Sequence, residues 1–67
     1  MKVFDTVELL EDLPEHGLKA GAVGTILEVF ESPLRAYEVE FANERGATIA
    51  ELALEPGRLR LRPRAPE

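Results

Sequence analysis

The sequence predicts an all-β fold in which five short strands form one small antiparallel sheet that closes on itself. Apolar and β-branched residues recur with the period of a strand in five segments, and Gly, Pro or Asn separates these segments. The 67-residue chain is 45% hydrophobic and has no cysteine, so a single core without disulfides must stabilise it. Closure into a barrel would protect the sheet edges of so small a protein.

The first strand is expected over residues 3–11. Val7 and Leu9 point to one side of this strand and their sequence neighbours to the other, which indicates one buried side. Pro14 lacks a backbone N–H and disfavours helical backbone at Leu13, so a turn should follow this strand. We therefore expect a long loop between the first strand and the second.

Two further strands are expected over residues 24–32, "GTILEVFES", and 35–43, "RAYEVEFAN". The latter segment has the clearest alternation in the chain, because Tyr37, Val39 and Phe41 share one side and glutamates separate them. This pattern predicts one buried face and one solvent-exposed face.

The fourth segment, residues 47–55, is ambiguous because its Ala, Glu and Leu residues also favour a helix. Residues 43–46, "NERG", precede it and supply asparagine and glycine, which tolerate the positive φ angles of tight hairpins. We favour a strand that pairs back across this hairpin, with a helix as the alternative.

The C-terminal part of the chain predicts a turn followed by a fifth strand. Residues 55–57, "EPG", are typical of a turn or a single 3₁₀ turn. Residues 58–62, "RLRLR", alternate two leucines with three arginines, as a strand with one apolar side does. We expect one domain over residues 1–62 and a flexible tail over residues 63–67.

These elements together predict an SH3-like barrel with a long diverging-turn loop between its first two strands. An OB-fold agrees less well, because it usually needs a longer chain and a helix between its third and fourth strands. The expected core contains Val7, Leu9, Leu18, Val23, Ile26 or Leu27, Val29, Tyr37, Val39, Phe41, Ile49, Leu52 and Leu61.

Residues 13–29, "LPEHGLKAGAVGTILEV", contain the only histidine of the chain and raise the question of a catalytic loop. The glycine spacing matches neither the P-loop nor the dinucleotide-binding motif. His16 has no cysteine nucleophile to activate, and the single carboxylates lack the spacing of zinc sites. We expect no enzymatic activity, cofactor or metal. The residues to which we assign structural turn roles are Pro14, Gly17, Gly21, Gly24 and Gly46.

The charge is distributed unevenly along the chain. Residues 1–55 contain 4 Lys/Arg and 12 Asp/Glu, a net of −8, whereas residues 56–67 contain 4 Arg and one Glu, a net of +3; together they give the overall −5. A negative body repels phosphate backbones and suits a basic protein partner better than a nucleic acid. Abundant Glu and Arg, with no Gln or Cys, also suggest a thermophilic source.

Two groups of residues are candidates for binding a partner. Carboxylates expected on the outer face of the sheet form the first group, as an acidic patch or merely a solvated face: Glu28, Glu38, Glu40 and Glu51. Phe4 and Phe30, near the loop at Leu34, form the second, because aromatic side chains there are expected to be partly exposed. The arginines of residues 58–62 are expected to pair with these carboxylates across strands, with a small basic edge as the alternative.

Nearly the whole chain resembles a bacterial family of short, uncharacterised SH3-like proteins. The segments that carry this resemblance are "DTVELLEDLPEHGLKAGAVGTILEVF" and "AYEVEFANERGATIAELALEPGRLR". They fit the family form D-x-V-x-L, D-L-P-E-x-G-L-x-x-G-x-x-G-T and Y-x-V-E-F. The family is similar in outline to the photosystem I E subunit and nitrile-hydratase β-type barrels, and more distantly to KOW modules.

The resemblance implies a fold without an activity, and members encoded beside toxin-like or nuclease-like genes suggest a protein partner. We expect a non-catalytic, acidic protein-binding module, such as an accessory, antitoxin-like or immunity-like subunit. The alternative is a KOW-like RNA- or ribosome-associated module, although Lys19 is the only cation between Lys2 and Arg35. The N-terminal segment lacks the apolar core of a signal peptide and no stretch could span a membrane, so we expect a cytoplasmic protein.

Overall fold

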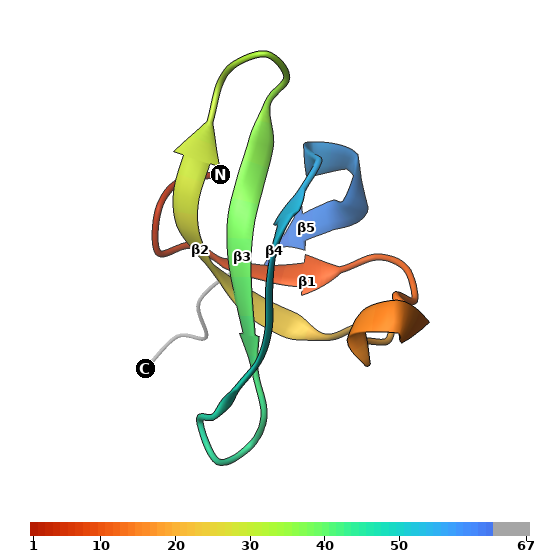
Figure 1. The fold of residues 1–67 in the computed structure, drawn as a ribbon. Helices are drawn as coiled ribbons and strands as arrows, with labels where there is room; N and C mark the ends of the chain where they lie inside the picture. The colour runs from red at the N-terminus through yellow and green to blue at the C-terminus, as the bar shows by residue number, and fades with distance from the viewer. Residues whose placement is uncertain (63–67) are drawn as a thin grey trace.

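The fold is an open, five-stranded antiparallel sheet, seen in a computed structural model that describes residues 1–62 (Figure 1). The sheet has the strand order β4-β3-β2-β1-β5, and all four pairs of neighbours are antiparallel. The elements along the chain are β1 (Thr6–Leu9), the 3₁₀ turn η1 (Pro14–His16), β2 (Val23–Phe30), β3 (Ala36–Ala42), β4 (Thr48–Leu54), the 3₁₀ turn η2 (Pro56–Arg58) and β5 (Leu59–Leu61). The predicted all-β class with five strands is confirmed.

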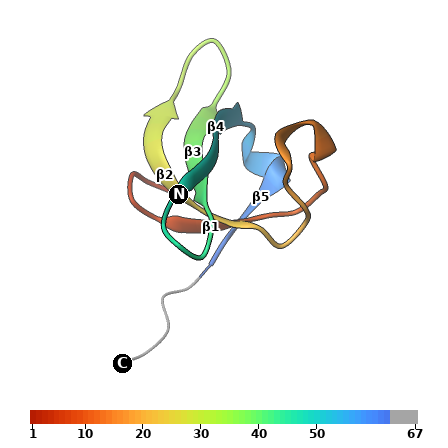
Figure 2. The same cartoon turned by 60° about the horizontal axis from the view of Figure 1, so that its bottom comes forward.

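The sheet does not close into the barrel that the sequence led us to expect. After β4, the turn η2 carries the chain to β5, which pairs with β1 and not with β4. Within residues 1–62, β4 therefore pairs on one side only, with β3. β1 runs across the direction of β3 and β4 (Figures 1 and 2). β2 belongs to both parts of the sheet, because its first residues pair with β1 and its residues from Gly24 to Phe30 pair with β3, apart from a register shift after Ile26.

The strand assignment of the ambiguous fourth segment is confirmed, and all five strands are shorter than expected. The expected strand over residues 3–11 is observed only from Thr6 to Leu9, because the backbone turns at Val3 and Phe4 on one side and bends at Glu11 on the other. The 3₁₀ turn expected around residues 55–57 is η2. The flexible tail that we expected over residues 63–67 lies outside the described residues.

Cross-strand pairs at the inner face explain which residues form the core. Tyr37, Val39 and Phe41 of β3 lie opposite the inward residues of β4, and Val39 also lies opposite Ile26 of β2. Apolar pairs of this kind stabilise a sheet because they remove apolar area from water on one face. The buried residues are Val7, Leu9, Leu13, Leu18, Ile26, Tyr37, Val39, Phe41, Leu54 and Leu59.

Three residues that we expected in the core are exposed instead. Val23 lies opposite Glu8, on the outer face of the sheet. Ile49 is 49% exposed because it is one residue out of phase with the inward-facing Ala50 and Leu52, and a register shift also leaves it unpaired. Leu61, at the end of the edge strand β5, is 47% exposed. Val29 and Leu52 are only partly buried.

Three buried leucines were missing from the predicted core: Leu13, Leu54 and Leu59. Leu13 and Leu18 exchange two backbone hydrogen bonds, of 2.9 and 3.1 Å, and both side chains are buried. The pairing folds the loop that carries η1 back toward the core. Leu54 lies opposite Tyr37 and Leu59 lies opposite Leu9, so both belong to the inner face.

Candidate functional site

Four carboxylates gather on the outer face of β2, β3 and β4. We call this set the acidic face: Glu28, Glu38, Glu40 and Glu51. Glu28 lies directly opposite Glu38, and Glu40 lies directly opposite Glu51, so each cross-strand pair places two like charges side by side. Such pairs destabilise a sheet. The structure thus brings together all four glutamates that the sequence singled out.

Arginine does not neutralise the acidic face within residues 1–62. The three ion pairs there are Arg35 with Glu31, Arg58 with Glu11, and Arg60 with Glu8. The sequence led us to expect the arginines of β5 and η2 opposite the acidic face, and this expectation is wrong. β5 pairs with β1, so its arginines meet the carboxylates of that part of the chain.

The pKa of Glu38 is raised above its ordinary value. Partial burial of the carboxyl group is the main cause, and the neighbouring carboxylates of Glu51 and Glu28 add to it. Glu40 receives a hydrogen bond of 2.7 Å from the Thr48 hydroxyl, which supplies a partner without supplying charge. This contact could not be predicted from the sequence, because it depends on the register shift beside Ala42.

Glu38→Gln is expected to stabilise the protein at pH 7 by about 0.2 to 1 kcal/mol, the usual size of a cross-strand like-charge term. An acid whose pKa is raised by folding binds its proton more tightly in the folded state. The Glu38 carboxyl group therefore contributes most to stability at pH values below its ordinary pKa of about 4.3. This contribution is lost as pH rises through the raised pKa of the folded state. Urea unfolding at several pH values tests this, with Glu15→Gln on the exposed loop as the control. A wild-type protein whose stability does not fall across this window relative to Glu38→Gln would contradict it.

The two aromatic candidates lie at different places along β2. Phe30 is opposite Ala36 at the end of β2, on the same side of the sheet as Glu28. Phe4 precedes β1, is 77% exposed and has a φ of 72°, and its N–H donates a 2.7 Å hydrogen bond to the carbonyl of Ile26. Leu34, in the connection between β2 and β3, is 71% exposed.

The loop that contains His16 has the geometry of a turn. Pro14 opens η1, His16 is exposed, and Gly17 follows with a φ of 70°. Gly21 has a φ of 93°, a conformation that glycine adopts without strain, and its N–H donates to the carbonyl of Leu9 at 2.7 Å. The Asp12 carboxylate accepts a hydrogen bond from the backbone N–H of Ala20 at 2.9 Å, which orders the loop.

Gly24 is required for close packing, which is a different role from the strand bend that we expected of it. A Cβ atom at this position would lie 2.6 Å from Cγ1 of Val39 and 2.9 Å from the carbonyl oxygen of Glu40. The irregularity of β2 falls instead between Ile26 and Glu28, where the register with β3 shifts. Gly46 has a φ of 81° in the connection between β3 and β4.

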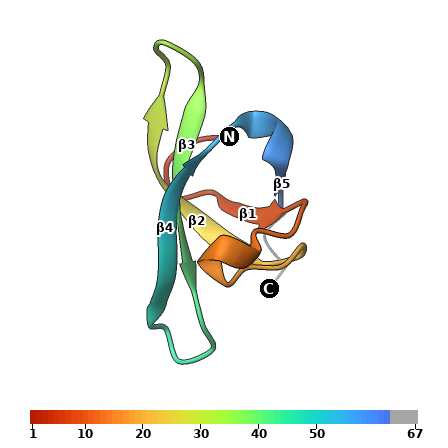
Figure 3. The same ribbon diagram turned by 45° about the vertical axis from the view of Figure 1, so that its right-hand side comes forward.

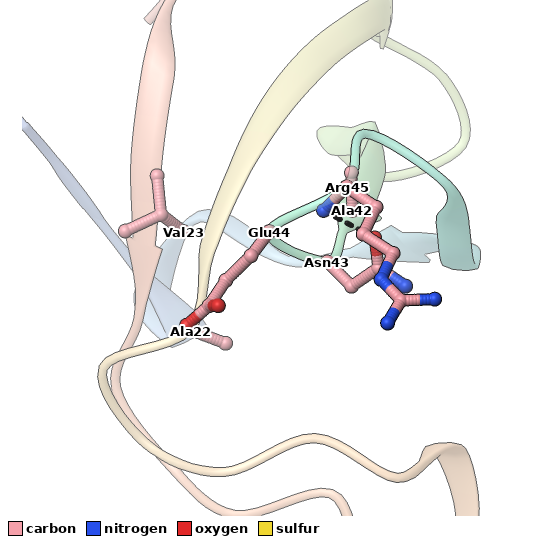
Figure 4. A pocket seen from close by; sticks show the side chains of 6 residues that line it. All are labelled: Ala22, Val23, Ala42, Asn43, Glu44 and Arg45. Atoms are coloured by element: carbon pink, nitrogen blue, oxygen red, sulfur yellow. Dashed lines mark hydrogen bonds between the residues drawn. The ribbon is translucent and has the colours of Figure 1, made fainter.

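A wide, open depression of about 730 Å³ lies between the start of β2 and the β3–β4 connection (Figure 4). The residues that line it are Ala22, Val23, Ala42, Asn43, Glu44 and Arg45. The Glu44 side chain extends toward Ala22, whereas the Arg45 side chain points away from it (Figure 4). The Asn43 side chain accepts hydrogen bonds from the N–H groups of Arg45 and Ala47, so its oxygen shapes the turn.

Residues 1–62 contain neither a metal-binding cluster nor a membrane-spanning helix. No group of three or more His, Asp or Glu side chains in this part of the chain is arranged to hold a metal ion. In the same part of the chain, no helix is long and apolar enough to cross a membrane.

The fold and the acidic face together define a small all-β protein with an open antiparallel sheet and a negatively charged outer surface. The chain belongs to the domain of unknown function family DUF4926, whose family model matches residues 3–61. No significant match is found among curated proteins or among solved structures.

Proposed function

We propose that this protein is a non-catalytic protein-binding module, which uses the acidic face to engage a basic surface of another protein. The observation that carries the proposal is the concentration of four glutamates in two directly opposed pairs, without an arginine or lysine partner within residues 1–62. Such an arrangement costs stability in the isolated protein. A local feature that costs stability is characteristic of a functional surface.

The proposal includes an SH3-like architecture for the sheet. It is supported by the strand order β4-β3-β2-β1-β5, the long loop between β1 and β2, and the 3₁₀ turn between β4 and β5. In this account the barrel stays open between β4 and β5. An accessory, antitoxin-like or immunity-like role in the cytoplasm fits a small acidic module of this kind, with the product of an adjacent gene as its partner.

An RNA- or ribosome-associated role receives less support. The glycine-containing loop suggested it, but the outer face of β2, β3 and β4 has the wrong charge for phosphate. Binding to RNA that weakens steeply with salt would favour it over the present proposal.

The proposal is tested by co-expression with the products of the adjacent genes and by measuring the affinity of the resulting complex. The double variant Glu38→Lys with Glu51→Lys is expected to weaken that complex by at least about tenfold, because charge reversal places like charges against a basic partner. The matched control is Glu15→Lys with Glu44→Lys, which changes the net charge equally at two exposed positions away from the acidic face. Equal losses in both double variants, or no complex at all, would contradict the proposal.

A further inference from the structure

The edge strand β4 is open to pairing over its regular part, residues 50–54. β4 lies at one end of the strand order, and Figure 3 shows it along one margin of the sheet. Within the described chain, its backbone pairs only with β3. Alternate N–H and C=O groups of such a strand point away from the sheet and can pair with another strand.

From Ala50 to Leu54, beyond the register shift at its start, β4 lacks the devices that usually protect an edge. It is seven residues long, and its sequence "TIAELAL" contains no proline, lysine or arginine. The opposite edge of the sheet differs in both respects. β5 has only three residues, with Arg60 at its centre and an arginine on either side. The free edge of β4 is therefore the more competent of the two for strand addition.

The two faces of β4 have different chemistry. Its inward residues Ala50 and Leu52 lie opposite Phe41 and Val39, and both remain only partly buried. Its outward residue Glu51 belongs to the acidic face. A strand added beside β4 would thus cover apolar side chains on one side and meet carboxylates on the other.

A pair of strands inside this chain already has the complementary pattern. In β5, Leu59 and Leu61 share the inner side, while Arg60 between them lies opposite Glu8 of β1 and forms an ion pair with it. An alternating basic and apolar strand therefore fits beside an acidic strand of this sheet.

A second copy of the chain fits the edge less well. Glu51 is the central residue of β4. An antiparallel pairing of two β4 strands about their centres would place this carboxylate against its own copy, and like charges directly opposite destabilise a sheet.

We infer that the free edge of β4 binds an extended segment of a partner protein in which basic and apolar residues alternate. The basic residues lie over the acidic face, and the apolar residues extend the core beside Leu52. This inference rests on the proposed function and adds to it the form of the partner and the mode of binding, which is strand addition.

The test uses a synthetic peptide as long as β4 in which Arg and Val alternate, and a second peptide of the same composition with its arginines in one block. We expect the alternating peptide to bind at least about tenfold more tightly than the block peptide, and more weakly at high salt. Amide hydrogen exchange should slow along β4 in the complex, whereas the amides of β5 should be unchanged. Glu51→Lys should weaken binding of the alternating peptide, and Glu15→Lys should not.

Three results would overturn strand addition. If both peptides bound equally and the amides of β4 were not protected, the acidic face would remain a binding surface, but the edge of β4 would not be the binding site. An absence of binding by either peptide, together with a partner complex that Glu38→Lys and Glu51→Lys weaken, would do the same. Self-association with β4 protected in the protein alone would make the occupant a second copy of the chain.

Discussion

Replacing Gly24 with valine is expected to lower the free energy of unfolding by about 3 kcal/mol, at the upper end of the usual cost of overpacking a core. The Cβ atom alone would lie within 3.0 Å of three atoms, and one of them is the backbone carbonyl oxygen of Glu40, which cannot turn aside as a side chain can. In a domain of this size, such a loss lowers Tm by roughly 12 to 24 °C. Thermal unfolding followed by circular dichroism provides the measurement.

Gly57→Val is the matched control, because a Cβ atom at Gly57 would meet nothing within 4 Å. We expect a change in Tm of a few degrees at most for this variant. If the two variants lost similar stability, the cost would come from valine on a glycine backbone in general and the close contact with β3 would not matter.

Leu18→Ala is expected to cost about 2 to 5 kcal/mol, the range for truncating a buried leucine. Leu18 is buried together with Leu13, and the two residues are joined by backbone hydrogen bonds. His16→Ala, two residues away on the exposed side of the same loop, should change stability by less than about 0.5 kcal/mol. Urea unfolding of both variants gives the comparison. A large loss from the histidine variant would contradict the purely architectural role that we assign to this loop.

The strands could be predicted from the sequence because their alternation is local. Tyr37, Val39 and Phe41 are buried as the pattern indicated, and the turn before β4 favoured a strand over a helix correctly. The same pattern also placed Glu38 and Glu40 on one outer face, which the cross-strand pairs bear out.

Features that depend on the pairing between strands could not be predicted. Ile49 and Leu52 cannot share one side of a regular strand, and only the pairing with β3 shows that Leu52 is the one that faces inward. The partner of β5 is set by where η2 directs the chain, so the sequence led us to the wrong carboxylates for Arg58 and Arg60. The open edge of β4 follows from the same feature. Because the chain is short, we expected the sheet to close into a barrel, yet the core forms without this closure.

Amide hydrogen exchange of the free, monomeric protein, resolved residue by residue, tests most directly whether β4 is an open edge. Over the regular part of β4, residues 50–54, we expect slow and fast exchange to alternate, because alternate N–H groups face β3 and solvent. The amides of β2 that lie between β1 and β3 should all exchange slowly. Uniformly slow exchange along β4 would contradict this account, since it would mean that another strand already covers the edge.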